Sequence, residues 1–142
     1  MVNPKEIRIG NIFNVDGGQM LRMRVERFFV DERDRDSAVI GSTREFLQHR
    51  HTCPLQMLEG VPLTEEIIQE LGFTWDMVSA TYTFDGIDII DNGEQGYFAL
   101  LTPQDYNLTL PVKYLHTLQN IYFYLKGKEL PIPVAHFDEE EQ

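Results

Sequence analysis

Short runs of β-branched and aromatic residues fill the first third of the chain, and each run ends at turn-forming residues. The first, residues 7–15, stops at Asp16-Gly17-Gly18, a sequence typical of a hairpin turn. From residue 20 to residue 30 the apolar residues at first alternate with charged ones, which predicts a strand with one buried face. A further short strand is expected over residues 37–41.

Residues 42–60 show no single pattern, although Phe46-Leu47 and residues 55–58 can each supply a short strand. Several short strands within about 60 residues are typical of small curled or closed sheets. The sequence therefore predicts a small SH3-like barrel or a curled antiparallel sheet at the N-terminus.

Two helices are predicted in the rest of the chain. The first begins at Thr64, whose hydroxyl can cap free amides, and ends at Gly72. The second covers residues 112–125, where apolar residues recur with helical spacing, and ends at Gly127. Between them, residues 81–101 are rich in strand formers, which predicts antiparallel strands packed by the C-terminal helix and an α+β fold.

Turns are expected at two places between these helices, Asp85-Gly86 and Asp91-Asn92-Gly93. The second is the stronger hairpin signal because longer apolar runs flank it. A short strand can follow at residues 108–110. We interpret the aspartates in these turns as turn formers rather than as catalytic carboxylates.

Charge divides the 142 residues into two parts. Residues 1–60 hold nine basic and nine acidic residues, including every arginine, whereas residues 61–142 hold three lysines and fourteen acids. Each part is small for independent stability, so we expect one compact unit. Within it we distinguish a β-rich, arginine-containing part (1–60), an acidic α+β part (61–137) and a disordered acidic tail (138–142).

The net charge of −11 disfavours a bulk electrostatic interaction with nucleic acid, so we expect no nucleic-acid partner. A single cysteine excludes an intramolecular disulfide and indicates a reducing compartment. No apolar run approaches the roughly 20 residues that span a bilayer, and the first residues form no apolar signal segment. We therefore expect a cytoplasmic protein without membrane contact. The aromatic content of 11% is high enough to support an interface between copies, so homo-oligomers are compatible with the sequence.

The common catalytic and phosphate-binding motifs are absent from the sequence. His49, His51 and Cys53 alternate, so on a strand they would share one face, and imidazole and thiolate groups suit zinc. The ordinary interpretation is a surface strand with polar groups. We favour this interpretation and expect no metal, no cofactor and no catalytic residue.

Arg22 and Arg24, with Arg27 as a further candidate, can form a basic face on the second strand. Arginine binds phosphate or carboxylate through paired hydrogen bonds. The alternative is that these arginines pair with Glu26 and Glu45 or with the acidic C-terminal part.

His116, Gln119 and Asn120 lie on one face of the predicted C-terminal helix. Such a face can bind a ligand through several directed hydrogen bonds. The alternative is that these side chains satisfy buried polar groups where the helix crosses the sheet.

Three stretches are similar to known sequences: VPLTEEI with LGF within residues 61–73, VKYLHTLQNIYF with GKEL within residues 112–130, and KEIRIGN at residues 5–11. They resemble a family of short uncharacterised proteins from phages, prophages and mobile elements of gut bacteria. They cover about a quarter of the chain, and residues 16–58 look unlike the family. The resemblance implies a bacterial cytoplasm and a gene on a mobile element, and no mechanism.

Small size, missing catalytic motifs and two parts of unlike charge favour a non-catalytic binding protein. Its expected partner is a host protein, a phage protein or a small signalling molecule, and inhibition of a host defence or regulatory component is one concrete version. The candidate binding residues are Arg22, Arg24, His116, Gln119 and Asn120. Two alternatives stay open: a small metal-assisted or acid/base hydrolase, and a nucleic-acid accessory protein.

Overall fold

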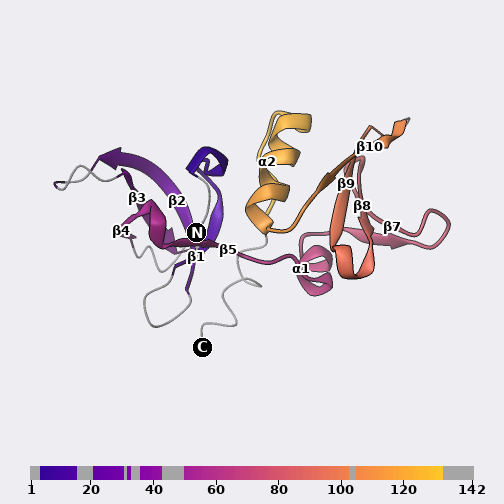
Figure 1. Ribbon diagram of the computed structural model, residues 1–142, viewed down its shortest axis with the longest axis horizontal. Coiled ribbons are helices and arrows are strands. Elements are labelled where there is room, and N and C mark those ends of the chain that lie inside the picture. The colour runs from indigo at the N-terminus through magenta and orange to yellow at the C-terminus, as the bar shows by residue number, and fades with distance from the viewer. Residues whose placement is uncertain are drawn as a thin grey trace. The chain divides into compact units, whose positions relative to one another are not determined.

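The computed structural model in Figure 1 confirms the α+β class, with two five-stranded antiparallel sheets and a C-terminal helix. It describes the backbone of residues 4–15, 21–30, 32, 36–42, 50–102 and 105–132. Side chains are described for residues 5–14, 24–30, 32, 36–38, 52–100 and 109–132. The chain divides into two compact units, whose described residues lie within 4–61 (unit 1) and 62–132 (unit 2). The expected acidic tail, residues 138–142, lies outside the described residues.

Unit 1 is a sheet with the strand order β4-β3-β2-β1-β5. Its strands are β1 (Ile12–Val15), β2 (Leu21–Val30), β3 (Asp36–Ser42), β4 (Arg50–Pro54) and β5 (Leu58–Gly60). Among the described residues, β4 and β5 remain the two edges, so the observed pairings do not close a barrel.

The long strand β2 has a register shift between Val25 and Arg27 in its pairing with β3. The core beneath it combines residues from every part of the unit: Ile7, Phe13, Val25, Ala38, Cys53, Leu55 and Leu58. The strand expected at residues 55–58 is wrong in part, because Leu55–Met57 form a 3₁₀ turn that buries Leu55 before β5 begins. The other expected strand, at Phe46-Leu47, lies outside the described residues.

Unit 2 is a simple antiparallel meander with the strand order β10-β9-β8-β7-β6. Its elements are α1 (Glu65–Glu70), β6 (Thr74–Asp76), β7 (Thr81–Phe84), β8 (Ile87–Asp91), β9 (Tyr97–Thr102), β10 (Asp105–Pro111) and α2 (Leu115–Lys126). Helix α1 starts as predicted, because the Thr64 hydroxyl accepts a hydrogen bond from the Ile67 amide at 3.2 Å.

Helix α2 begins three residues later than the apolar pattern predicts. Tyr114 is still extended and pairs with Pro62 in an isolated β-bridge, and the Leu63 amide donates to the Lys113 carbonyl at 3.0 Å. This pairing competes with helix formation before Leu115. The predicted end is confirmed: Gly127 is left-handed and its amide donates to the Phe123 carbonyl.

The tight hairpin turn of unit 2 lies between β7 and β8 rather than at the stronger sequence signal. Asp85 and Gly86 both have positive φ (50° and 81°), as a two-residue turn of the primed type requires. The connection from β8 to β9 is longer and contains a 3₁₀ turn, Gly93–Gln95. There the Asp91 carboxylate accepts a hydrogen bond from the Gly93 amide at 2.9 Å, in agreement with a turn-forming role.

Both helices of unit 2 cover the same face of its sheet. Tyr82 and Phe84 lie two residues apart on β7 and therefore point to one face. The hydroxyl of Tyr82 hydrogen-bonds to Glu65 of α1, and the ring of Phe84 lies 6.1 Å from the ring of Tyr122 of α2. We call this side of the sheet the helix-covered face; Thr83 and Asp88 lie on the other face and are partly exposed.

Neither described helix has the length and apolar character that crossing a bilayer requires.

Candidate functional site

The residues predicted as metal ligands do not form a described cluster. His49 lies outside the described residues, and of His51 only the backbone is described, opposite Ile40 of β3. Cys53 belongs to the core of unit 1, and burial raises the pKa of its thiol. Among the described side chains, no group of three His, Cys, Asp or Glu residues can hold a metal ion.

The predicted arginine face lies on β2. The backbone of Arg22 pairs with Asn14, and that of Arg24 pairs with Ile12. The side chain of Arg24 is partly buried; that of Arg22 is outside the described side chains. Arg27 follows the register shift and is exposed. Ligand binding by Arg22 and Arg24 stays a prediction.

The predicted polar face of α2 lies mostly inside unit 2. His116 and Gln119 are each 1% exposed, and Asn120 is partly exposed. The His116 ring stacks on Tyr114 at 5.5 Å with an interplanar angle of 14°. This burial places His116 and Gln119 among core residues, and ligand binding by the three side chains stays a prediction.

Strand β6, an edge strand of unit 2, exposes an apolar side chain to water. One row of directly paired residues crosses the helix-covered face from β9 to β6: Ala99, Ile89, Tyr82 and Trp75. The first three are buried, but Trp75 is 49% exposed. Its ring makes an edge contact with Tyr82 at 4.9 Å, which holds the indole in place while much of its surface faces water.

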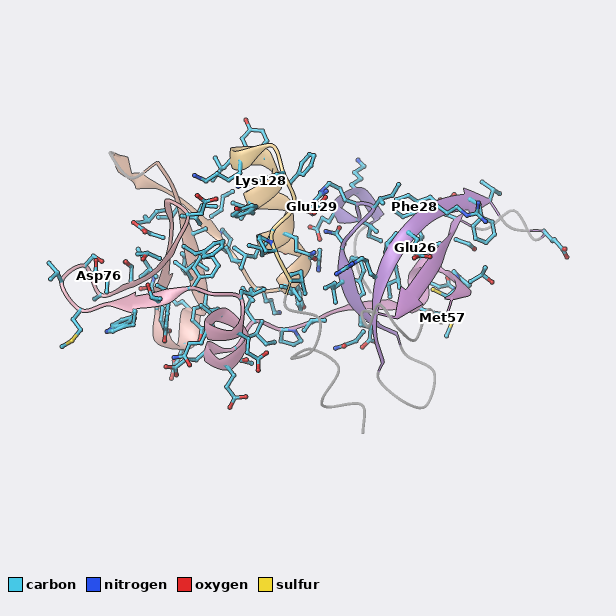
Figure 2. All side chains as sticks on the ribbon, turned by 180° about the vertical axis from the view of Figure 1, so that it is seen from behind. Glu26, Phe28, Met57, Asp76, Lys128 and Glu129 are labelled. Atoms are coloured by element: carbon cyan, nitrogen blue, oxygen red, sulfur yellow. The ribbon has the colours of Figure 1, made fainter. Side chains whose placement is uncertain are left out.

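The connection that follows β6 adds more exposed apolar surface. Met77 is 85% exposed and Val78 is 97% exposed. The Asp76 carboxylate accepts a hydrogen bond from the Val78 amide at 2.9 Å, and Ala80 has a positive φ of 56°, so the turn has a defined local structure. Figure 2 shows Asp76 near the end of the β6–β7 hairpin, which extends away from the helices of unit 2. We call Trp75, Met77 and Val78 the hairpin patch.

The hairpin patch belongs to an acidic stretch of the chain. Residues 62–112 contain nine acidic residues and no lysine or arginine. Asp76 and Asp88 are close enough to interact: burial, and then the charge of Asp76, raise the pKa of Asp88. Both lie on the face opposite Trp75, since Asp88 pairs with Thr83 and Thr83 pairs with Thr74.

Two of the other three edge strands, β4 and β10, carry features that oppose further strand pairing, whereas the short edge strand β5 (Leu58–Gly60) carries no such feature. Strand β4 ends in Pro54 and β10 ends in Pro111, and proline lacks the amide that a sheet ladder needs. The pairing of β10 with β9 is also irregular between Asp105 and Thr109. Strand β6 contains no proline, and within the described chain it pairs only with β7.

Two tyrosines of the sheet of unit 2, Tyr82 and Tyr97, have raised pKa values. Burial, and then the hydrogen bond to Glu65, raise the pKa of Tyr82 to about 12. Burial, and then the charges of Asp91 and Glu65, raise the pKa of Tyr97. These tyrosines stay protonated at neutral pH, so they support the sheet rather than move protons.

The hairpin patch leaves little signal in the sequence. The run of residues 73–78 is too short to show a strand period, and nothing in it marks which face is buried. The available signal was weaker: the single tryptophan of the chain lies in a stretch without basic residues.

Comparison of the chain with models of protein families, with curated proteins and with solved structures finds no match.

Proposed function

We propose that this protein is a non-catalytic binding protein that holds a protein partner on the hairpin patch of unit 2. The observation that carries the proposal is the row of paired apolar residues that ends at the half-exposed Trp75, on an edge strand with no described outer neighbour. Exposed aromatic residues beside an unpaired edge are typical of interaction sites. The bacterial mobile-element context of the sequence resemblance favours a host or phage protein as partner, with inhibition of a host defence or regulatory component as one version.

The two alternative functions receive less support. The hydrolase hypothesis depends on His49, His51, Cys53 and His116. Cys53 has a buried thiol with a raised pKa, and His116 is 1% exposed. The nucleic-acid hypothesis depends on Arg22 and Arg24, and the net charge of −11 opposes it.

A curled, SH3-like form of unit 1 is part of the same proposal. Strand β2 pairs with β1 at residues 21–24 and with β3 at residues 23–30, and the register shift between Val25 and Arg27 follows the end of the pairing with β1. A bulge bends a strand and increases its twist, which lets one sheet fold over its own core.

A displayed library of random peptides tests the proposed function without assuming any partner. We expect peptides that bind the full chain and lose binding to the double variant Trp75→Ser, Val78→Ser. The matched control is Tyr124→Ser, which removes another largely exposed aromatic ring from unit 2 and should bind like the native protein. Circular dichroism establishes that each variant is folded. Enrichment that is equal on native protein and double variant would contradict the proposal.

A further inference from the structure

We propose that the partner binds the β6 edge as an added β-strand in which apolar residues alternate with lysine or arginine. This inference rests on the proposed function and names the chemistry of its ligand. It follows from three properties of the edge: a backbone that no described strand pairs with on its outer side, the two unlike faces of β6, and the negative charge of Asp76 and Asp88.

The backbone of β6 offers the pairing groups. Thr74, Trp75 and Asp76 are all exposed and hydrogen-bond as a strand to β7 on one side. In an antiparallel ladder the groups on the other side are then available to an extended segment. Strand addition of this kind gives affinity through main-chain hydrogen bonds and specificity through alternate side chains.

On the helix-covered face of the sheet, the added strand should present an apolar residue to β6. A residue of the added strand that pairs directly with Trp75 extends the row of Ala99, Ile89 and Tyr82. Its side chain lies beside the half-exposed indole and removes part of that surface from water.

On the opposite face of the sheet, the added strand should present basic residues to β6. The neighbours in the added strand pair with Thr74 and Asp76 and point to the face that also holds Asp88. An opposite charge across from Asp76 is favourable, and a carboxylate there is unfavourable. Residues 62–112, which include all five strands of this sheet, contain no lysine or arginine, so none of these strands supplies a cation to Asp76.

The same charge argues against a second copy of this chain as the occupant. Edge-to-edge pairing of two β6 strands would bring two sets of Asp76 and Asp88 to one face, where like charges oppose association. Acidic residues at an exposed edge thus prevent self-pairing and still allow a basic segment to bind.

The test uses the full chain and four synthetic peptides of equal length. One alternates lysine with valine, one alternates glutamate with valine, one alternates glutamine with valine, and one is the lysine peptide with N-methyl groups on alternate amides. Trp75, the only tryptophan, provides the readout, because its emission shifts to shorter wavelength when the indole is covered. Native-state hydrogen exchange at Thr74–Asp76 measures whether a strand has formed.

We expect the lysine peptide to bind most tightly, to shift the Trp75 emission and to protect the β6 amides from exchange. N-methylation should weaken binding more than tenfold, because it removes the donors of the added ladder. Asp76→Asn should weaken binding of the lysine peptide about threefold to fivefold. The same variant should leave binding of the glutamine peptide unchanged, which separates charge pairing from a general loss of structure.

Three results would overturn the inference: equal binding of the glutamate and lysine peptides, binding that is insensitive to N-methylation, or concentration-dependent dimers that form through β6. In each case the peptide library still decides whether the hairpin patch is a binding site. Failure of the ligand chemistry is therefore distinguishable from failure of the proposed function.

Discussion

Gly72 and Gly127 follow the two helices of unit 2 with positive φ, but their surroundings differ. At Gly72, with a φ of 102°, an added Cβ would lie 3.2 Å from the Phe84 ring. At Gly127, with a φ of 69°, nothing lies within 4 Å of that position. The same residue type is thus required for backbone conformation at both sites, and also for close packing at one of them.

We therefore expect Gly72→Ala to destabilise the protein more than Gly127→Ala. A left-handed backbone alone costs alanine about 1–2 kcal/mol, and at Gly72 the Phe84 ring must also move. Urea unfolding followed by circular dichroism measures both variants. Equal free energies of unfolding for the two variants would contradict this expectation, because they would show that moving the Phe84 ring costs no stability.

Tyr122 and Asp85 connect α2 to the turn between β7 and β8. The Tyr122 hydroxyl donates to the Asp85 carboxylate at 2.6 Å, and the Lys128 ammonium lies 3.7 Å from the same oxygen. The hydrogen bond from Tyr122, aided by nearby lysines, lowers the pKa of Asp85. Burial, and then Asp85, raise the pKa of Tyr122 to about 12.

The pKa of Tyr122 predicts a loss of stability in alkali. The pKa of Tyr122 is higher in the folded state than the ordinary 10.0. The protonated hydroxyl therefore contributes fully to the free energy of unfolding below pH 10, and this contribution is lost as the pH rises towards 12. Tyr122→Phe should remove one late ionisation in an absorbance titration at 295 nm and make stability above pH 10 less dependent on pH. Tyr124→Phe, which changes a largely exposed ring, is the control that should keep the late step.

Asp85 gives the opposite dependence in acid. The pKa of Asp85 is lowered in the folded state. The ionised carboxylate therefore contributes to the free energy of unfolding above the ordinary pKa of 3.8, and this contribution is lost as the pH falls through the pKa of the folded state. In Tyr122→Phe the pKa of Asp85 should move back towards that ordinary value, which carbon-detected NMR of the carboxylate measures.

At the scale of elements, the β6–β7 hairpin combines an apolar patch with a negative electric field. Trp75 is half-exposed next to Asp76, and Asp88 lies one strand beyond β7 on the other face. A cation should therefore collect near the indole, and an anion should be excluded from it.

Collisional quenching of Trp75 fluorescence tests this field. Relative to a free tryptophan analogue, caesium should quench the protein more effectively than iodide at low ionic strength. Asp76→Asn should reduce the difference between the two ions, while quenching by neutral acrylamide stays the same. Iodide that quenches as well as caesium would contradict a negative field at the hairpin patch.

At the scale of the whole molecule, the acidic excess opposes the folded state. The net charge is −11, and the pKa of Asp88 is raised by burial and by Asp76. Compact states of strongly charged chains are destabilised by self-repulsion, which salt screens.

We expect sodium chloride, raised from about 0.01 M to about 0.15 M, to increase the free energy of unfolding at pH 7 by on the order of 1 kcal/mol. Urea unfolding at each concentration measures the increase. The effect should shrink near pH 4, where carboxylates are partly neutral. Stability that falls with salt at pH 7 would mean that attractive ion pairs outweigh the repulsion.

Much of the fold could be predicted from local sequence signals. The cap at Thr64, the helix end at Gly127 and the strand at residues 81–84 depend on neighbouring residues alone. The start of α2 could not be predicted, because Tyr114 is held extended by Pro62, a residue far away in the sequence.

The sequence by itself determined the α+β class, the presence of the two helices with the glycine that ends each, and the separation of an arginine-containing part from an acidic one. These properties depend on local periodicity, capping residues and composition. Only the tertiary structure decided that His116 and Gln119 are buried while Trp75 stays half-exposed at an edge. Burial depends on which strands pair and which face the helices cover, and such pairing joins residues whose separation along the chain carries no local signal.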